Sequence, residues 1–176
     1  ENDMTVIGDP NPDIFGSISN TFKYKQWTLN ALMTYSLGND VYNYARSQME
    51  SLSTFNNQSQ AVLNRWRHEG DVTNMPKMAY GDPMGNARFS DRWIEDGSYL
   101  RLKSVVLSYD LNLRGKFGNY IQGCTIFATG ENLVTFTKYK GLDPEFSYGS
   151  NPLYYGIDPC VSPQPRTVSI GIKLAL

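Results

Sequence analysis

Hydrophobic and polar residues alternate along several stretches of the chain, most clearly near its C-terminus. Every second residue from Val168 to Leu176 is aliphatic, and the residues between them are small or polar. A similar alternation runs from Trp27 to Gly38, where Leu32 is the one exception. A period of two residues indicates a β-strand with one apolar face. The pattern therefore predicts strands at 27–38 and 166–176.

Three further strands have weaker patterns. Residues 15–25 alternate loosely and reach strand 27–38 through Lys25-Gln26, which predicts a hairpin. Residues 98–112 are rich in β-forming residues, but their alternation changes phase near Lys103, which predicts a β-bulge there. A turn at about 113–119 leads to a strand at about 120–137.

Two long connections separate these strands, one at about 39–97 and the other, rich in proline, at about 138–165. The first is predicted to contain a helix near Ser59–Arg67, with Ser59 as its N-cap. Short turns then alternate with long loops, so that all the short connections lie at one end of an antiparallel sheet. Outer-membrane barrels have this asymmetry, with short periplasmic turns and long extracellular loops.

Five strands cannot close a barrel, since bacterial barrels of one chain have an even number of at least about eight. The open edges would leave backbone groups unpaired in lipid. We therefore expect further strands outside this chain. Glu1–Pro10 also lacks the features of a signal peptide, so that such a peptide has been removed or the natural N-terminus lies upstream.

Composition supports a sheet protein and excludes some partners. Aromatic residues make up 13% of the 176 residues, and there are 15 glycines and 9 prolines. The formal net charge of −1 provides no positive field for nucleic acid. No apolar run approaches the ~18 residues of a membrane-spanning helix. Cys124 and Cys160 fall in a strand and a distant loop, and their state is left open.

Several short motifs, in a fixed order, resemble the SusC/RagA-like TonB-dependent importers of the outer membrane. The resemblance spans nearly the whole chain. Its pieces are Gly8-Asp9-Pro10-Asn11-Pro12-Asp13-Ile14, Arg65-Trp66 with Glu69-Gly70, Ile94-Glu95-Asp96-Gly97-Ser98-Tyr99-Leu100-Arg101-Leu102-Lys103, Gly130-Glu131-Asn132-Leu133-Val134-Thr135-Phe136-Thr137-Lys138-Tyr139, Gly141-Leu142-Asp143-Pro144-Glu145 and Arg166-Thr167.

This resemblance implies an all-β, 22-stranded transmembrane barrel, of which this chain would be the C-terminal part with about the last five strands. It also implies an upstream plug that is absent from this chain, a SusD-like surface lipoprotein as partner, and energy relayed by TonB. The cargo would be oligosaccharides or oligopeptides. Barrels of this kind commonly end in an aromatic residue, whereas this chain ends in Leu176.

The sequence offers little for catalysis or for a cofactor. His68 stands alone, and the two cysteines are distant from it in sequence, so no nucleophile and base pair is recognisable. Carboxylate pairs such as Asp143 with Glu145 are explained better by turns. Asp3, Asp9 and Asp13 lack the spacing of a calcium loop. We therefore predict no enzyme and no cofactor, and we assign no metal ligands, while a structural metal elsewhere in the loops stays open.

Aromatic residues in the long connections are the candidate contacts for cargo or for a partner protein. Aromatic rings bind the apolar faces of sugars and peptide side chains, but they also pack loops together and are common at protein interfaces. The second explanation is favoured. The candidates are Trp66, Tyr80, Phe146, Tyr148, Tyr154 and Tyr155.

Two alternatives stay open. A secreted β-sandwich module could bind carbohydrate through exposed aromatic residues, and its apolar strand faces, such as Val168–Leu176, would then pack against a second sheet. A fragment of an enzyme is a third possibility. On the leading interpretation, outward aromatic residues such as Trp27, Tyr35 and Tyr109 lie at the membrane interface.

Overall fold

A computed structural model describes residues 4–111, 121, 123–146 and 151–175. The chain divides into two compact units, each described by itself. The sheet unit comprises Pro12–Gly38, Ser98–Lys138 and Pro163–Leu176, and the loop unit comprises Glu1–Asn11, Asn39–Gly97 and Tyr139–Ser162. No helix among the described residues has the length and apolar character needed to cross a bilayer.

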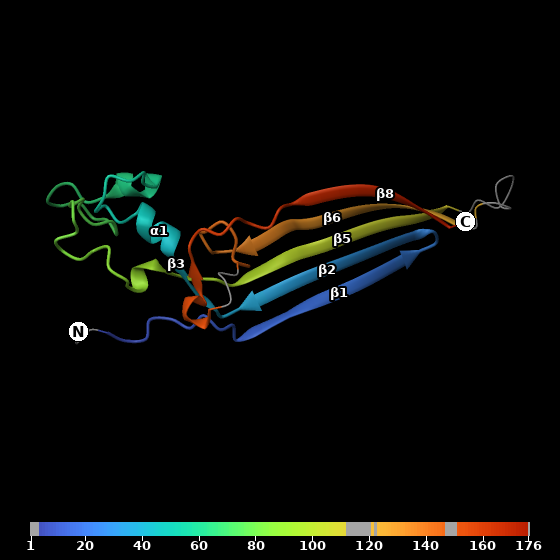
Figure 1. Ribbon diagram of the computed structural model, residues 1–176, viewed down its shortest axis with the longest axis horizontal. Coiled ribbons are helices and arrows are strands. Elements are labelled where there is room, and N and C mark those ends of the chain that lie inside the picture. The colour runs from blue at the N-terminus through green and yellow to red at the C-terminus, as the bar shows by residue number, and fades with distance from the viewer. Residues whose placement is uncertain (1–3, 112–120, 122, 147–150, 176) are drawn as a thin grey trace. The chain divides into compact units, whose positions relative to one another are not determined.

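The sheet unit is one antiparallel sheet of five long strands in the order β1-β2-β5-β6-β8 (Figure 1). These strands lie within three residues of the ranges expected from the sequence. Their bounds are Ile14–Tyr24 (β1), Trp27–Leu37 (β2), Tyr99–Leu111 (β5), Gly123–Thr137 (β6) and Thr167–Ala175 (β8). The all-β, antiparallel architecture predicted from the alternation is therefore confirmed.

The β1–β2 hairpin turns at Lys25-Gln26, between the paired residues Tyr24 and Trp27. Lys25 adopts φ 53°, because the tight hairpin turns that match the twist of strands need a left-handed residue. The turn expected at 113–119 lies outside the described residues. Both long connections join strand ends at the opposite end of the sheet, where Ser36 pairs with Tyr99.

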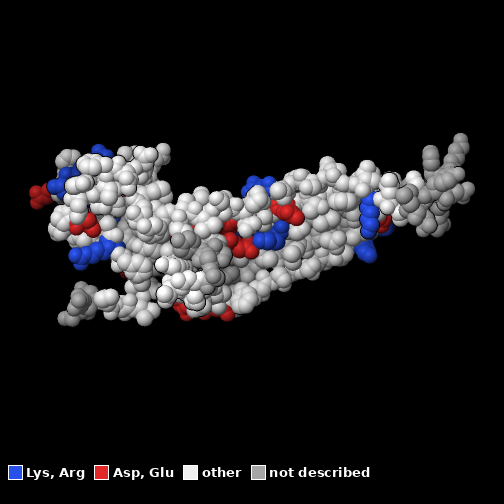
Figure 2. All heavy atoms as spheres, viewed as in Figure 1, with Lys and Arg blue, Asp and Glu red and all other residues white. Residues whose placement is uncertain are grey.

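One face of the sheet is almost wholly apolar, because the register aligns the alternating residues of all five strands. Asn20 is the one polar residue among the strand positions on this face in the described register. Leu29, Leu107, Ala128 and Ile170 make one row across four strands. Figure 2 shows a broad uncharged stretch of the strands between two groups of charged side chains.

These apolar side chains are exposed. Ile170 is 79%, Ile172 65% and Leu174 54% exposed. The buried hydrophobic side chains of the described residues all belong to the loop unit. The second layer required by a β-sandwich is therefore missing from the part of the chain that the structure describes, and that alternative loses its support.

The other face of the sheet is polar and rich in serine and threonine. Cross-strand hydrogen bonds link its side chains: Thr21 Oγ1 donates to Asn30 Oδ1 at 2.7 Å, and Thr125 Oγ1 donates to Asp110 Oδ1 at 2.6 Å. Gly171 lies against the ring of Phe127, its neighbour on β6. The sheet therefore separates an apolar surface from a hydrogen-bonded, polar one.

The predicted bulge at Lys103 is present. The register of β5 shifts between Leu102 and Ser104 against both of its neighbours, and on β6 it passes over Asn132 and Leu133. Asn132 has φ 51°, and its Nδ2 donates to the carbonyl of Pro165 at 3.1 Å. The extra residues let the alternation resume in phase, so the apolar face continues across the bulge.

The loop unit contains a small sheet in the order β4-β3-β7 beside a short helix. Strand β3 (Asp40–Asn43) pairs antiparallel with β4 (Ile94–Asp96) and parallel with β7 (Ile157–Asp158). Helix α1 (Tyr44–Met49) follows β3 directly, and Asn43 caps it by accepting a hydrogen bond from Arg46 N at 2.9 Å. The two long connections thus share one sheet.

The helix predicted at Ser59–Arg67 is wrong in type and length. Only a 3₁₀ turn, η1 (Gln60–Asn64), forms there, although Ser59 does cap it by accepting from Ala61 N at 3.2 Å. Arg65 is already extended, and the amide of Trp66 donates to the carbonyl of Met75 instead of continuing a helix. Two more 3₁₀ turns, η2 (Asp91–Trp93) and η3 (Pro152–Tyr154), complete the elements.

Gly38, just after β2, has no room for a side chain, so substituting it tests the close packing at this end of the sheet. It has φ +86°, and an Oδ2 of Asp13 lies 2.2 Å from the position that a Cβ would take. Gly70 has φ +96° with nothing within 4 Å of that position, so it provides a matched control. We expect Gly70→Ala to lose roughly 1 kcal/mol of stability, and Gly38→Ala to lose more.

Thermal unfolding, followed by circular dichroism, measures both losses. Adding Asp13→Ala to the Gly38→Ala variant removes the clash and recovers part of the loss. Equal destabilisation by the two glycine substitutions contradicts the close contact.

Candidate functional site

Ionic contacts hold the loop unit together around Arg46 of helix α1. Arg46 Nε lies 3.1 Å from Glu50 Oε2, and Nη1 lies 2.6 Å from Glu95 Oε1. Although burial lowers the pKa of Arg46, its hydrogen bonds to Glu95 and Glu50 raise it above its usual value on balance. Glu95 Oε2 also accepts from Lys140 N at 2.9 Å, so this carboxylate joins both long connections.

The centre of this region is Trp93, whose side chain is fully buried at 0% exposure. Two guanidinium groups face its ring: Arg92 at 4.5 Å and Arg46 at 5.6 Å from the centroid. Its Nε1 donates to the carbonyl of Arg88 at 3.0 Å. Cations over an indole ring are attracted by its quadrupole, more strongly when water is excluded.

A second buried polar pair lies in the other long connection. Tyr139 Oη donates to Asp158 Oδ2 at 2.5 Å, and Asp158 Oδ1 accepts from the amides of Cys160 and Val161. Burial, and then the hydrogen bond and charge of Asp158, raise the pKa of Tyr139 far above its ordinary value. Tyr139 is therefore a neutral donor at any physiological pH, and the charged acceptor is satisfied on both oxygens.

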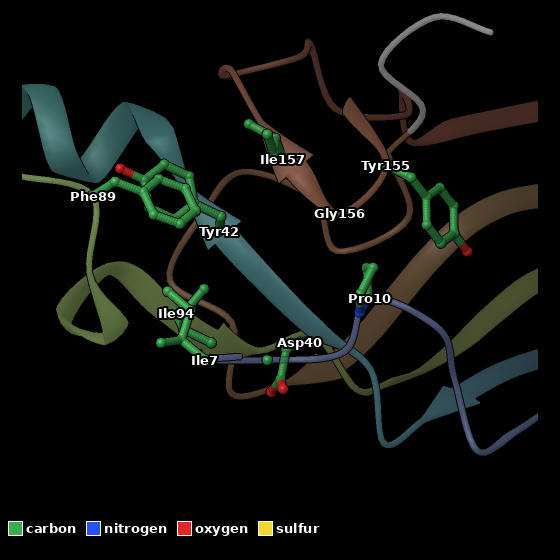
Figure 3. Close-up of a pocket in the computed structure, with 10 residues that line it drawn as sticks. Ile7, Pro10, Asp40, Tyr42, Phe89, Ile94, Tyr155, Gly156 and Ile157 are labelled. Atoms are coloured by element: carbon green, nitrogen blue, oxygen red, sulfur yellow. The ribbon is translucent and has the colours of Figure 1, made fainter. Parts of the chain in front are cut away.

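One pocket in the loop unit has a volume of about 180 Å³ and lies beside β3. Figure 3 shows the rings of Tyr42 and Phe89 stacked on one side, with centroids 4.4 Å apart. The pocket is closed by the segment Ile7–Pro10, because Asp40 N donates to the Asp9 carbonyl at 2.8 Å. Its lining is mostly apolar, and Asp40 is its one charged residue.

The close approach of Gly156 and Pro10 fixes this pocket. Gly156 has φ +80°, and Pro10 Cβ lies 2.4 Å from where a Cβ on residue 156 would stand. The Gly156 carbonyl accepts from Tyr42 N at 2.8 Å, just before β7 begins. A side chain at residue 156 would therefore separate the segments that form the wall.

The second pocket is larger, about 400 Å³, and more polar. Trp66, Met75 and Pro76 supply apolar surface, while the other lining residues are polar or basic. Those residues are Thr73, Asn74, Lys77, Asn86 and Arg92. No carboxylate lines this pocket among the described residues.

The structure distributes the predicted aromatic contacts over separate places and does not gather them at one site. Trp66 lines the larger pocket and Tyr155 lines the smaller one. Tyr80 stacks on Phe55 with centroids 4.9 Å apart, and both rings are largely exposed. Tyr154 is exposed and Phe146 is half-buried. Tyr148 lies outside the described residues.

Sequence reasoning missed Phe55, Phe89, Lys77 and Arg92 as pocket or surface residues. Phe55 and Phe89 were detectable as further aromatic residues of the same long connection. Nothing in the sequence distinguishes Lys77 and Arg92 from other basic residues, because their grouping depends on how this irregular segment folds.

The described residues contain no group of three or more potential metal ligands. Asp9 is occupied by hydrogen bonds from Asn11, which lower its pKa, and Asp3 lies outside the described residues. His68 is exposed beside Asp71 at 4.0 Å. Cys124 and Cys160 are both free thiols.

Comparison with known proteins gives consistent relatives, although no family model matches the chain. TonB-dependent receptor P3 of Formosa agariphila is 31% identical over 179 residues, covering 98% of this chain and 17% of the receptor. TonB-dependent receptor SusC of Bacteroides thetaiotaomicron is 27% identical over 175 residues, covering 99% and 16% respectively. The chain therefore spans about one sixth of the length of these relatives.

Solved structures give the same result. The RagAB peptide importer in its closed-closed state matches with a TM-score of 0.81 at 28% identity, over 96% of this chain and 18% of that chain. Its open-open state matches with a TM-score of 0.78 at 28% identity, over 94% and 17%. These relatives are receptors and importers of the outer membrane, so the predicted resemblance, fold class and location are confirmed.

The contribution of the Tyr139–Asp158 hydrogen bond to the stability of the loop unit can be tested by substitution. Tyr139→Phe leaves the shape intact but removes a donor from a buried carboxylate, so we expect a loss of about 1–3 kcal/mol. Because folding raises the pKa of Tyr139, the stabilisation is present below the unfolded value of about 10 and is lost as the pH rises above it.

Native-state hydrogen exchange of the full-length protein at increasing pH measures this effect in peptides from the loop unit. The wild type should lose protection from exchange above about pH 10, and the Tyr139→Phe variant should lack this pH-dependent loss. Tyr154→Phe, at an exposed tyrosine, is the control. A Tyr139→Phe variant as stable as wild type contradicts the role of the bond.

Proposed function

Since this chain is homologous over nearly all its length to TonB-dependent receptors of the SusC/RagA kind, we propose that it forms part of the wall and surface loops of an outer-membrane nutrient importer. The observation that carries this proposal is the exposed apolar face of the five-stranded sheet, backed by a polar face. In water such a face would be a large aggregation-prone patch, whereas in a bilayer it contacts acyl chains.

The aromatic residues of the apolar face suit the two interfaces of a bilayer. Trp27 and Tyr109 lie together at the hairpin end, with ring centroids 4.7 Å apart, and Tyr35 lies eight residues further along β2. Eight residues span about 26 Å along a strand, and about 20 Å when the strand is tilted by about 40°. This is close to the roughly 25 Å apolar band of such barrels.

In the proposed assembly, further strands pair with β1 and β8, and a plug fills the barrel. The loop unit lies outside the cell and, with a SusD-like lipoprotein, encloses an oligosaccharide or oligopeptide cargo. TonB then supplies the energy that moves the plug. The chain thus contributes to transport and not to turnover of a substrate. Trp66, Tyr80, Phe146, Tyr148, Tyr154 and Tyr155 are the proposed contacts with cargo or lipoprotein.

Lipid contact can be measured residue by residue on β8. Spin labels are placed at single cysteines at Ile170 and Ile172, and at the polar-face controls Ser169 and Lys173, in a background lacking Cys124 and Cys160. In liposomes, we expect oxygen dissolved in lipid to relax the first two labels, and a water-soluble nickel chelate to relax the other two. Equal accessibility of all four labels to the nickel chelate counts against a membrane barrel.

Uptake tests the transport function itself. Deleting the gene of the full-length protein should abolish energy-dependent uptake of one cargo class, and comparing fluorescent oligosaccharides with fluorescent oligopeptides identifies which. Collapsing the proton gradient should have the same effect in wild type. Recovery of the protein from the soluble fraction without detergent, or unchanged uptake of both classes in the deletion strain, would refute the proposal.

A further inference from the structure

The larger pocket of the loop unit carries two basic side chains and no acidic one among its described lining residues. Lys77 and Arg92 both line it, together with the polar side chains of Thr73, Asn74 and Asn86. The smaller pocket differs, since its lining is mostly apolar with Asp40 as its charged member. A concave site with two cations and several hydrogen-bonding groups is suited to an anion.

Arg92 is held in place without an ion pair among the described residues. The carboxylates of Glu50 and Glu95 are both bound by Arg46 at 3.1 and 2.6 Å. Arg92 Nη2 instead contacts the sulfur of Met75 at 2.9 Å, and its guanidinium lies 4.5 Å from the Trp93 ring centroid. Glu50 attracts it only at longer range. Arg92 Nη1 also donates to the Asn86 carbonyl at 3.5 Å, so the guanidinium is held at the wall of the pocket by contacts that leave its charge without a carboxylate partner among the described residues.

Burial has a consequence for Arg92. It lowers the pKa of the guanidinium, since a charge is less stable where water is partly excluded. The side chain stays charged at physiological pH all the same. An anion entering the pocket would offset this loss of solvation, and it would gain a charge-assisted hydrogen bond.

Lys77 is oriented by an aromatic ring. Its Nζ lies 5.7 Å from the centroid of the Trp66 ring, and Trp66 is itself fixed by the hydrogen bond from its amide to the Met75 carbonyl. The ammonium group therefore lies over one face of the ring and would compete there with a stacked sugar. Trp66 acts here through the cation that it positions.

We propose that this pocket binds a carboxylate of the imported cargo, with Lys77 and Arg92 as its ligands. This inference rests on the proposed importer function and specifies its substrate class: an acidic oligosaccharide, such as one built of uronic acids, or an acidic peptide. Both sources offer the same group, a planar carboxylate that Arg92 can bind through two parallel hydrogen bonds.

Binding to the full-length receptor in detergent tests the proposal with two matched pairs of probes. One pair is a uronic-acid trisaccharide and its methyl ester. The other is a blocked tetrapeptide with two glutamates and its glutamine counterpart. Titration calorimetry on wild type should show preference for the acidic member of one pair, which identifies the source, and this preference should weaken as salt is raised.

Variants then locate the site. Lys77→Gln and Arg92→Gln should each weaken binding of the acidic probe by about tenfold or more and leave the neutral probe unchanged. Lys77 is exposed, so its substitution does not threaten folding. Lys140→Gln, at an exposed lysine of the same unit outside the pocket, is the matched control and should bind as wild type does.

The inference is overturned if neither pair shows a preference for its acidic member, or if Lys77→Gln binds the acidic probe as tightly as wild type. The two failures are distinguishable. If energy-dependent uptake does not depend on the charge of the cargo, the carboxylate site is refuted but the importer function is retained. If deleting the gene leaves uptake unchanged, the importer function itself is refuted.

Discussion

Backbone hydrogen bonding is the constraint from which the sheet unit follows. In hydrocarbon an unpaired N–H or C=O has no water to bond, so each strand must pair along its whole length with its neighbours. The antiparallel register from β1 to β8 meets this demand for the inner strands, and it aligns the alternating side chains into two opposite faces. A one-residue slip would turn every aliphatic side chain of a strand to the polar side. Even the bulge at Lys103 keeps the phase.

The loop unit is stabilised by different interactions, because it has a core of its own and is not spread over a lipid surface. Trp93, Leu52 and Val41 are its most deeply buried large side chains, and Arg46 ties helix α1 to β4 through Glu95. Its buried carboxylates accept hydrogen bonds, as Glu50 does from Arg46 and Asp158 from Tyr139. The two basic residues of the larger pocket have no ion pair among the described residues, and they are the proposed ligands of an anion.

The strands were predictable from the sequence, and the loops were not, for the same physical reason. A strand with one apolar face leaves a period of two residues, as Val168–Leu176 shows, and a phase change betrays a bulge, as at Lys103. Pairs such as β3 with β7 are only a few residues long and join positions more than a hundred apart, so no local pattern records them. The helix predicted at Ser59–Arg67 does not continue because the amide of Trp66 donates to the carbonyl of Met75, nine residues further along the chain, and not to a carbonyl of the preceding turn.

The N-cap at Ser59 was predicted correctly because capping depends on neighbouring residues alone. The end of the turn was predicted wrongly because it depends on a hydrogen bond to a residue outside the turn. The same division applies to the site. The aromatic candidates could be chosen by residue type and region, but the pockets that hold Trp66 and Tyr155 depend on contacts between distant segments.

The parallel pairing of β3 with β7 constrains both long connections. It brings the beginning of one long connection against the end of the other, and Glu95 adds a second link through Lys140. Neither connection is expected to change its fold by itself, because a change that displaces β7 also removes a partner strand from β3.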